Sequence, residues 1–164
     1  MKKFVFPFLF LGVCLFCFSS CASDFFGIKG KGNIVTEFGS LGIFSSVELT
    51  TSADVQILKS DSAFSVEVSD YENIIQYLST KVVTNALVIS TSPGTTILQN
   101  SRAKVIVRMP DNLKSIVVTG SGTVQVDSSF ISLQSLALSG SGNIKLKAES
   151  QGLKTGELII QVTN

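Results

Sequence analysis

The sequence predicts an all-β protein, arranged as a single-domain, parallel β-helix-like stack of short strands, with a β-sandwich as the alternative. Two observations lead to this prediction. From Asn33 onward, apolar and polar residues alternate with a period of two, and β-branched residues are frequent. A strand–turn–strand unit containing Gly-Ser-Gly also occurs twice, about 20 residues apart. With 164 residues, the chain is long enough for one domain with a substantial core.

The N-terminus is predicted to be a secretory signal peptide, residues 1–20. Lys2 and Lys3 are followed by an almost wholly apolar run from Phe4 to Phe18, and small residues come next. This run is shorter than the stretch of about 20 residues that a membrane-spanning helix needs. We therefore expect the protein to be exported.

The cleavage site has two interpretations. Phe18-Ser19-Ser20-Cys21 resembles a bacterial lipobox, which predicts that Cys21 is lipidated and anchors the chain to a membrane. Alternatively, an ordinary signal peptidase would recognise Ser20-Cys21-Ala22 and cut before Ser23. Residues 21–32 are then the anchor and a glycine-containing tether, and residues 33–164 form the folded domain.

Composition excludes several classes of function. Of the three cysteines, Cys14 and Cys17 lie inside the apolar run and Cys21 is the last. Because no cysteine follows Cys21, the mature chain has neither a disulfide nor a free thiol nucleophile. The chain has no histidine, which excludes the usual catalytic triads. Without Lys2 and Lys3, 11 of the 13 basic residues remain against 12 acidic ones, a net charge of −1. No clustered basic patch is present, so we expect no nucleic-acid partner.

Alternation locates the first strands of the domain. It predicts strands within residues 45–51, 53–60, 63–70, 86–90 and 104–109. Turn-forming residues such as Pro93-Gly94 and Pro110-Asp111-Asn112 separate some of these runs. Residues 71–82 fit either a short helical turn begun near Asn73 or another strand.

The repeat accounts for the second half of the chain. Residues 113–118, 119–122 and 123–126 align with 133–138, 139–142 and 143–146, so each unit is a strand, a tight turn and a strand. One unit cannot bury its own apolar face, which predicts that the units stack. Residues 158–162 alternate again and suggest a partial third copy, whose strand would form an open sheet edge able to pair with another chain.

The repeated glycines have a structural interpretation and a chemical one. Gly120, Gly122, Gly140 and Gly142 lie at the turns, where glycine permits a positive φ and a close approach of two backbones. A phosphate-binding loop would need Lys-Ser/Thr and a helix after the glycines, and a dinucleotide fingerprint also needs a helix. The calcium-binding repeat needs an aspartate where Gln125 and Lys145 stand. We therefore expect no cofactor and no metal site.

Two sets of charged residues remain as candidate functional groups. Asp70 and Glu72 are close in sequence, as in the carboxylate pair of a polysaccharide hydrolase, although acids beside a turn are usually solvated. Arg102, Lys104 and Arg108 form a short basic row, with Lys104 and Arg108 on one outward strand face. That row is either a solvated strand face or a binding face for an anionic partner such as an acidic glycan.

The chain resembles the family of putative autotransporter adhesins with a head GIN domain, which occurs in bacterial envelopes. The resemblance covers roughly Leu41 to Val162 and is carried by FSSVELTTSADVQILKSDSAFSVEVSDYENIIQYLSTKV, NALVIS, AKVIVRMPDNLKSIVVTGSG and LSGSGNIKL. It implies a β-helix-like stack, export and a lipoprotein signal. We expect a non-catalytic envelope protein that binds glycan or protein. The alternatives are an assembly protein that pairs through its terminal strand and, third, a polysaccharide hydrolase.

Overall fold

The computed structural model describes residues 27–61, 64–126, 130–148 and 156–161. The predicted signal peptide and Cys21 lie outside these residues. The prediction of an all-β protein is confirmed, because apart from the single 3-10 turn η1 (Ile75–Tyr77) every described element is a strand. The strands are β1 Ile28–Lys29, β2 Ile34–Ser40, β3 Ser46–Leu49, β4 Asp54–Lys59, β5 Ser65–Tyr71, β6 Leu78–Val83, β7 Ala86–Thr91, β8 Ile97–Gln99, β9 Lys104–Met109, β10 Ser115–Val118, β11 Thr123–Val126, β12 Ser135–Leu138, β13 Asn143–Ala148 and β14 Gly156–Gln161.

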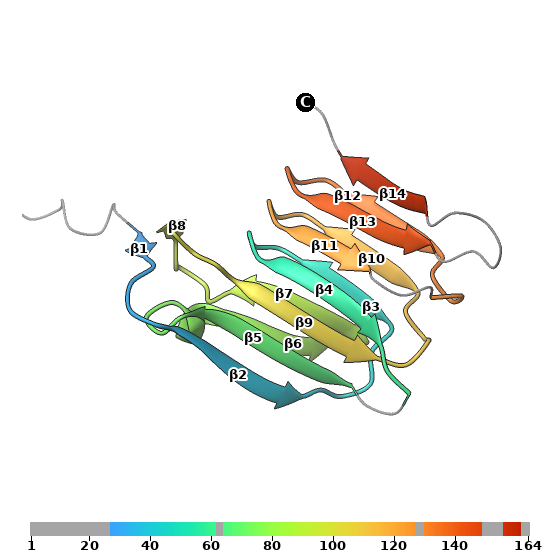
Figure 1. Ribbon diagram of the computed structural model, residues 1–164, viewed down its shortest axis with the longest axis horizontal. Helices are drawn as coiled ribbons and strands as arrows, with labels where there is room; N and C mark the ends of the chain where they lie inside the picture. The colour runs from blue at the N-terminus through green and yellow to red at the C-terminus, as the bar shows by residue number, and fades with distance from the viewer. Residues whose placement is uncertain (1–26, 62–63, 127–129, 149–155, 162–164) are drawn as a thin grey trace, which may run out of the picture.

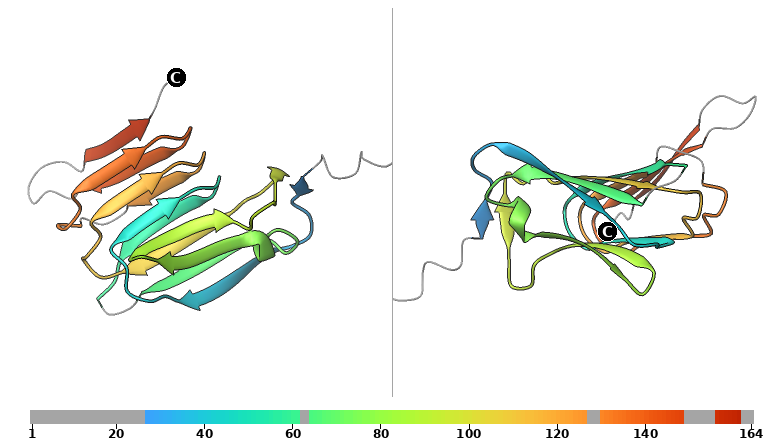
Figure 2. Two further views of the ribbon diagram at one scale, coloured as in Figure 1. Left: turned by 180° about the vertical axis from the view of Figure 1, so that it is seen from behind. Right: turned by 90° about the horizontal axis from the view of Figure 1, so that it is seen from below.

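Two large sheets face each other across the core (Figures 1 and 2). The seven-stranded sheet has the order β14-β13-β11-β4-β9-β5-β2, and the five-stranded sheet has the order β12-β10-β3-β7-β6. The middle strands of both sheets are parallel, whereas β14, β5, β2 and β6 pair antiparallel. The structure therefore consists of two mixed sheets rather than a uniformly parallel stack.

Strand–turn–strand layers form the centre of the molecule. The layer β10–β11 pairs with β12–β13 in the register that the sequence repeat predicts, Ser115 opposite Ser135 and Thr123 opposite Asn143. On the other side it pairs with β3–β4, in which Ser46 and Asp54 occupy the same positions. Residues 46–57 are therefore a copy of the unit that the sequence analysis did not identify as a repeat, because they lack Gly-Ser-Gly.

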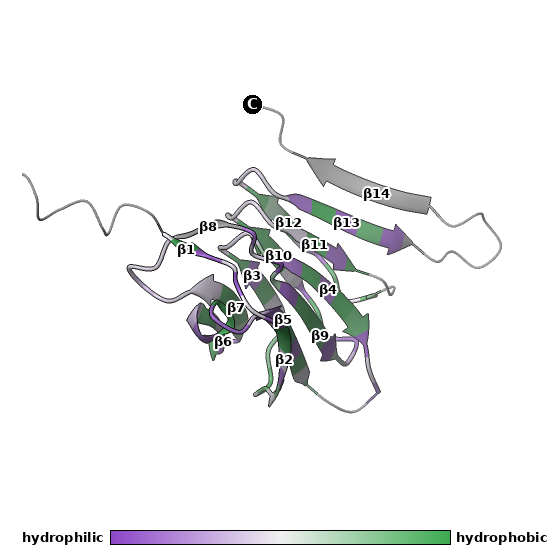
Figure 3. Ribbon diagram, turned by 60° about the vertical axis from the view of Figure 1, so that its left-hand side comes forward, coloured by the Kyte–Doolittle hydropathy of each residue, from purple (hydrophilic) through white to green (hydrophobic). Residues whose placement is uncertain are grey.

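The core lies between the two sheets and is built by the alternation that predicts the strands. Along each strand, side chains point in turn into the core and outward, which gives the alternating hydrophobic and hydrophilic bands in Figure 3. In the layers β3–β4 and β10–β11, and at Ile144 of β13, the inward side chains are no more than 2% exposed: Val47, Leu49, Val55, Ile57, Ile116, Val118, Val124, Val126 and Ile144. These side chains form one continuous cluster, consistent with layers that cannot bury their apolar faces singly.

Residues 71–82 combine both of the predicted alternatives. Tyr71 ends β5, the 3-10 turn follows, and β6 then pairs antiparallel with β7. Ile74 and Ile75 are buried, so the turn closes one end of the core.

The structure at the two ends of the domain differs from the one that the sequence predicts. The prediction of a third copy is wrong for residues 158–161, the described part of that segment, because β14 runs antiparallel to β13 rather than parallel as β11 does. Part of the predicted tether is also structured, since β1 pairs with β8. The side chain of Asn73 holds this segment, donating to the carbonyl of Lys29 and accepting from the backbone N–H of Lys31.

The hairpin between β6 and β7 offers a stability prediction. Its two turn residues, Thr84 and Asn85, have φ values of 47° and 66°. A β-branched residue is disfavoured there, whereas asparagine is preferred. We expect Thr84→Asn to raise the free energy of unfolding by about 0.5–1 kcal/mol in urea titrations. Thr96→Asn, at an exposed position without a positive φ, should change it by less than about 0.5 kcal/mol. Equal effects of the two substitutions would contradict the explanation.

Candidate functional site

The repeat glycines are structural and act through close backbone approach. None of the four has a positive φ. The expectation that they permit a positive φ at the turns is therefore wrong, and close backbone approach is the reason that remains. A Cβ would instead lie under 3.0 Å from the backbone of the preceding layer: Thr51 for Gly120, Ala53 for Gly122, Thr119 and Gly120 for Gly140, and Gly122 for Gly142. The turns thus stack so tightly that a side chain has no room.

The β3–β4 layer has no glycine at its turn, because no tight turn lies beneath it. Thr51 and Ala53 occupy the places of Gly120 and Gly122. The layer beneath them, β7 and β9, is joined by residues 92–103 and not by a tight turn. Among the turns of these three layers, glycine is therefore found where one tight turn rests on another.

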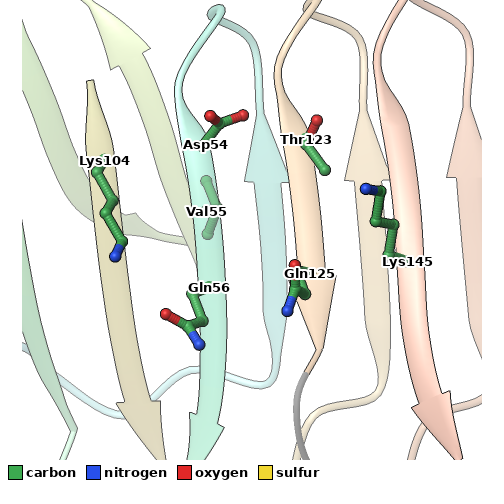
Figure 4. Close-up of a pocket in the computed structure, with 7 residues that line it drawn as sticks. All are labelled: Asp54, Val55, Gln56, Lys104, Thr123, Gln125 and Lys145. Atoms are coloured by element: carbon green, nitrogen blue, oxygen red, sulfur yellow. The ribbon is translucent and has the colours of Figure 1, made fainter. Parts of the chain in front are cut away.

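The outward face of the seven-stranded sheet carries the charged and polar side chains of the layers. A hollow of about 280 Å³ lies on this face. Its lining residues come from four neighbouring strands: Lys104 of β9, Asp54, Val55 and Gln56 of β4, Thr123 and Gln125 of β11, and Lys145 of β13. Figure 4 shows Lys104 and Lys145 on opposite sides, with Gln56 and Gln125 between them. Such a surface suits a ligand that offers hydroxyl groups and negative charge.

The two lysines of the hollow could each pair with an anionic group of a ligand. Neither Lys104 nor Lys145 forms an ion pair with a described residue. Asp54 is the register partner of Lys104 but lies beyond ion-pair distance of it in the structure. The hollow therefore has one more positive than negative side chain.

The three residues of the predicted basic row have different surroundings in the structure. Lys104 and Arg108 lie on the outward face of β9 with Ile106 between them. Lys104 lines the hollow, whereas Arg108 donates to Glu67 Oε2 at 3.3 Å. Arg102 precedes β9, and its backbone N–H donates to Asp70. Lys145 was not predicted to accompany Lys104, although both lie on outward positions of strands that the repeat and the alternation predict.

Asp70 has a structural role. Its side chain is 0% exposed, so the expectation that an acid beside this turn is solvated is wrong for Asp70. Its Oδ1 accepts the N–H groups of Tyr71 at 2.7 Å and Arg102 at 2.9 Å, and its Oδ2 accepts the hydroxyl of Ser101 at 2.7 Å. Asp70 thus fastens the end of β5 to the segment that leads into β9. A carboxylate enclosed in this way cannot reach a polysaccharide.

A second acid, Asp111, joins the layers at the opposite end of β9 from Asp70. Lys59 Nζ donates to Asp111 Oδ2 at 2.7 Å, and the N–H of Ile131 donates to Oδ1 at 3.1 Å. The hydrogen bond from Lys59, and to a smaller extent its charge and the backbone N–H groups of Ile131 and Ser132, lower the pKa of Asp111 below its ordinary value of 3.8, against the opposing effect of burial.

This pKa shift predicts a pH-dependent contribution to stability. Because the pKa of Asp111 is lower in the folded than in the unfolded chain, its stabilisation is present above pH 3.8 and is lost as the pH falls through the folded-state pKa. The pair is partly exposed, so we expect Asp111→Asn to lower the free energy of unfolding at pH 7 by less than about 1 kcal/mol. Urea titrations of both proteins should converge at pH values below the folded-state pKa. A difference that persists unchanged there would contradict this assignment.

The described part of the chain has neither a cluster of metal-binding side chains nor a membrane-spanning helix. No three acidic, cysteine or histidine side chains gather there in a way that could hold a metal ion. Within the same residues, no helix has the length and apolarity needed to cross a membrane.

Solved structures resemble this fold at low sequence identity. A putative adhesin from Bacteroides fragilis superimposes with a TM-score of 0.65 and 19% identity over 73% of this chain and 56% of its own. A putative lipid binding protein from Parabacteroides distasonis gives 0.61 and 23% over 71% and 50%. A putative adhesin from Parabacteroides merdae gives 0.59 and 19% over 67% and 46%. The chain thus spans about half the length of these proteins.

The comparison with curated proteins gives no match. A family model does match, over residues 43–156, and its description is "Putative auto-transporter adhesin, head GIN domain". The matched residues include both Gly-Ser-Gly turns and every residue that lines the hollow. The match covers well over half of the sequence, and the chain therefore belongs to the head GIN domain family of putative auto-transporter adhesins.

Proposed function

We propose that this protein is a non-catalytic, lipid-anchored component of the bacterial cell envelope that binds a glycan or protein partner through the outward face of its seven-stranded sheet. The observation that carries the proposal is the polar hollow, in which Lys104 and Lys145 flank Gln56 and Gln125 without an ion pair to a described residue. The family description supports an adhesive role. Lipid on Cys21 and the residues after it would hold the domain at the membrane surface.

Site-specific photo-crosslinking in living cells tests which face meets the partner. A photoreactive amino acid at Thr123, in the hollow, should yield a covalent adduct with the partner. The matched control is Val117, which points outward from the five-stranded sheet on β10 and is similarly half-buried. An adduct at Thr123 but not at Val117 is expected. Adducts at Val117 alone, or at neither position, would contradict the proposal.

A second candidate function is assembly through the terminal strand. The observation that favours it is the position of β14 at the edge of the seven-stranded sheet, where a strand has one side without a partner strand. If chains pair there, Ile160→Pro should reduce the oligomeric fraction in sedimentation velocity, because proline removes a backbone donor. A monomer at all concentrations, unchanged by Ile160→Pro, would exclude assembly by this edge.

A further inference from the structure

The outward face of the seven-stranded sheet contains a row of side chains that extends well beyond the hollow. Residues directly opposite one another in neighbouring strands point to the same side of a sheet. The strand registers therefore align one outward residue from each of six strands, called here the long row: Phe38, Glu67, Ile106, Gln56, Gln125 and Lys145. With strands about 4.8 Å apart, the long row measures about 24 Å.

The two ends of the long row differ in chemistry. At one end Phe38 is 79% exposed on β2, so its ring is accessible from solvent. At the other end Lys145 lies in the hollow, and Lys104 comes from the neighbouring row. Phe38 lies outside the repeat and joins this face through the pairing of β2 with β5.

The acids on this face do not cancel its positive charge. Glu67 is bound to Arg108, which neutralises the one carboxylate in the long row. Asp54 is a second acid, whereas Lys104 and Lys145 form no ion pair with a described residue. On β14, the register places Glu157 opposite Lys147. A ligand along the row would thus meet an aromatic ring, an apolar patch at Ile106, amide groups and two lysines.

We propose that the ligand of this face is a linear carboxylated polysaccharide that lies across the strands along the long row. One sugar ring packs its apolar side on Phe38, hydroxyl groups bond to Gln56 and Gln125, and carboxylates pair with Lys104 and Lys145. A nucleic acid fits less well, because acids stand among the cations of this face and it lacks a dense basic footprint. This inference rests on the proposed function, since it names the ligand class of the same face.

Biolayer interferometry with the full-length protein in detergent tests the ligand class. The immobilised probes are polygalacturonate, the neutral polymer pullulan and a single-stranded oligothymidine. Binding to polygalacturonate alone is expected, and it should weaken as salt is added. Lys104→Glu combined with Lys145→Glu should lower the affinity by about tenfold or more. Phe38→Ala should lower it by roughly two- to tenfold.

Matched variants separate this face from a general charge effect. Lys81→Glu with Lys114→Glu reverses two exposed lysines elsewhere, and Ile131→Ala removes an exposed apolar side chain of another surface. These changes should leave the affinity for polygalacturonate within about twofold of the unaltered protein. An equal loss in both lysine pairs, or equal binding of oligothymidine or pullulan, would overturn the inference. If polygalacturonate does not bind while Thr123 still crosslinks to a partner, this inference fails and the proposed function stands.

Discussion

Replacing Gly122 with alanine is expected to lower the free energy of unfolding by about 3 kcal/mol or more, or to prevent folding. The added Cβ would collide with the backbone of Ala53, including its carbonyl oxygen. That backbone cannot move aside easily, because β4 is hydrogen-bonded to β11 on one side and to β9 on the other. Urea or thermal unfolding followed by circular dichroism measures the loss.

Gly42→Ala is the matched control for this change. Apart from Gly42 itself and its two chain neighbours, no heavy atom would lie within 4 Å of a Cβ at this position, and its φ is not positive. Alanine should there be neutral or stabilise the protein by about 0.4–1 kcal/mol, because it restricts the unfolded chain. If Gly122→Ala were as harmless as Gly42→Ala, tight stacking of the turns would not be the reason for the Gly-Ser-Gly repeat.

Removing the carboxylate of Asp70 should cost about 3 kcal/mol of folding free energy. Asp70→Ala leaves the N–H groups of Tyr71 and Arg102 and the hydroxyl of Ser101 without their acceptor in a buried place. Asp70→Asn retains one oxygen acceptor and should cost less. Chemical denaturation of the purified variants gives both values.

The control for Asp70 is its neighbour in the hydrolase hypothesis, Glu72. Glu72 is exposed, so Glu72→Gln should alter stability by less than about 0.5 kcal/mol. A hydrolase would instead lose activity on a glycan panel in both variants while Asp70→Asn stayed fully stable. That result would contradict the structural role assigned to Asp70.

Much of the fold could be predicted from local patterns. Alternation located the strands because one side of each strand, such as Val105 and Val107 on β9, packs into the core. The aligned repeat predicted the register of β10–β11 against β12–β13 because identical layers bury the same positions on one another. Strand direction was less accessible, since alternation reads the same for a parallel and an antiparallel strand. β14 was therefore misassigned as a further copy of the unit.

The candidate site could be predicted only in part. Lys104 and Arg108 were found because they belong to one strand, whereas Lys145 and Phe38 join the same face through pairing with distant strands. Asp70 accepts hydrogen bonds from Ser101 and Arg102, about 30 residues away in the chain, and local alternation cannot predict such long-range contacts. The layer of residues 46–57 escaped notice because Thr51 and Ala53 rest on no turn and need not be glycine.

The proposed function requires a protein that is exported, anchored by a lipid and able to meet its partner outside the cell membrane. Its most direct test is protease shaving of intact cells together with intact-mass measurement of the protein extracted from membranes. We expect a mature chain that begins at Cys21, carries the mass of a lipid and is cut by protease added to whole cells. A mass corresponding to an unmodified chain beginning at Ser23, or complete protection in intact cells, would contradict the account.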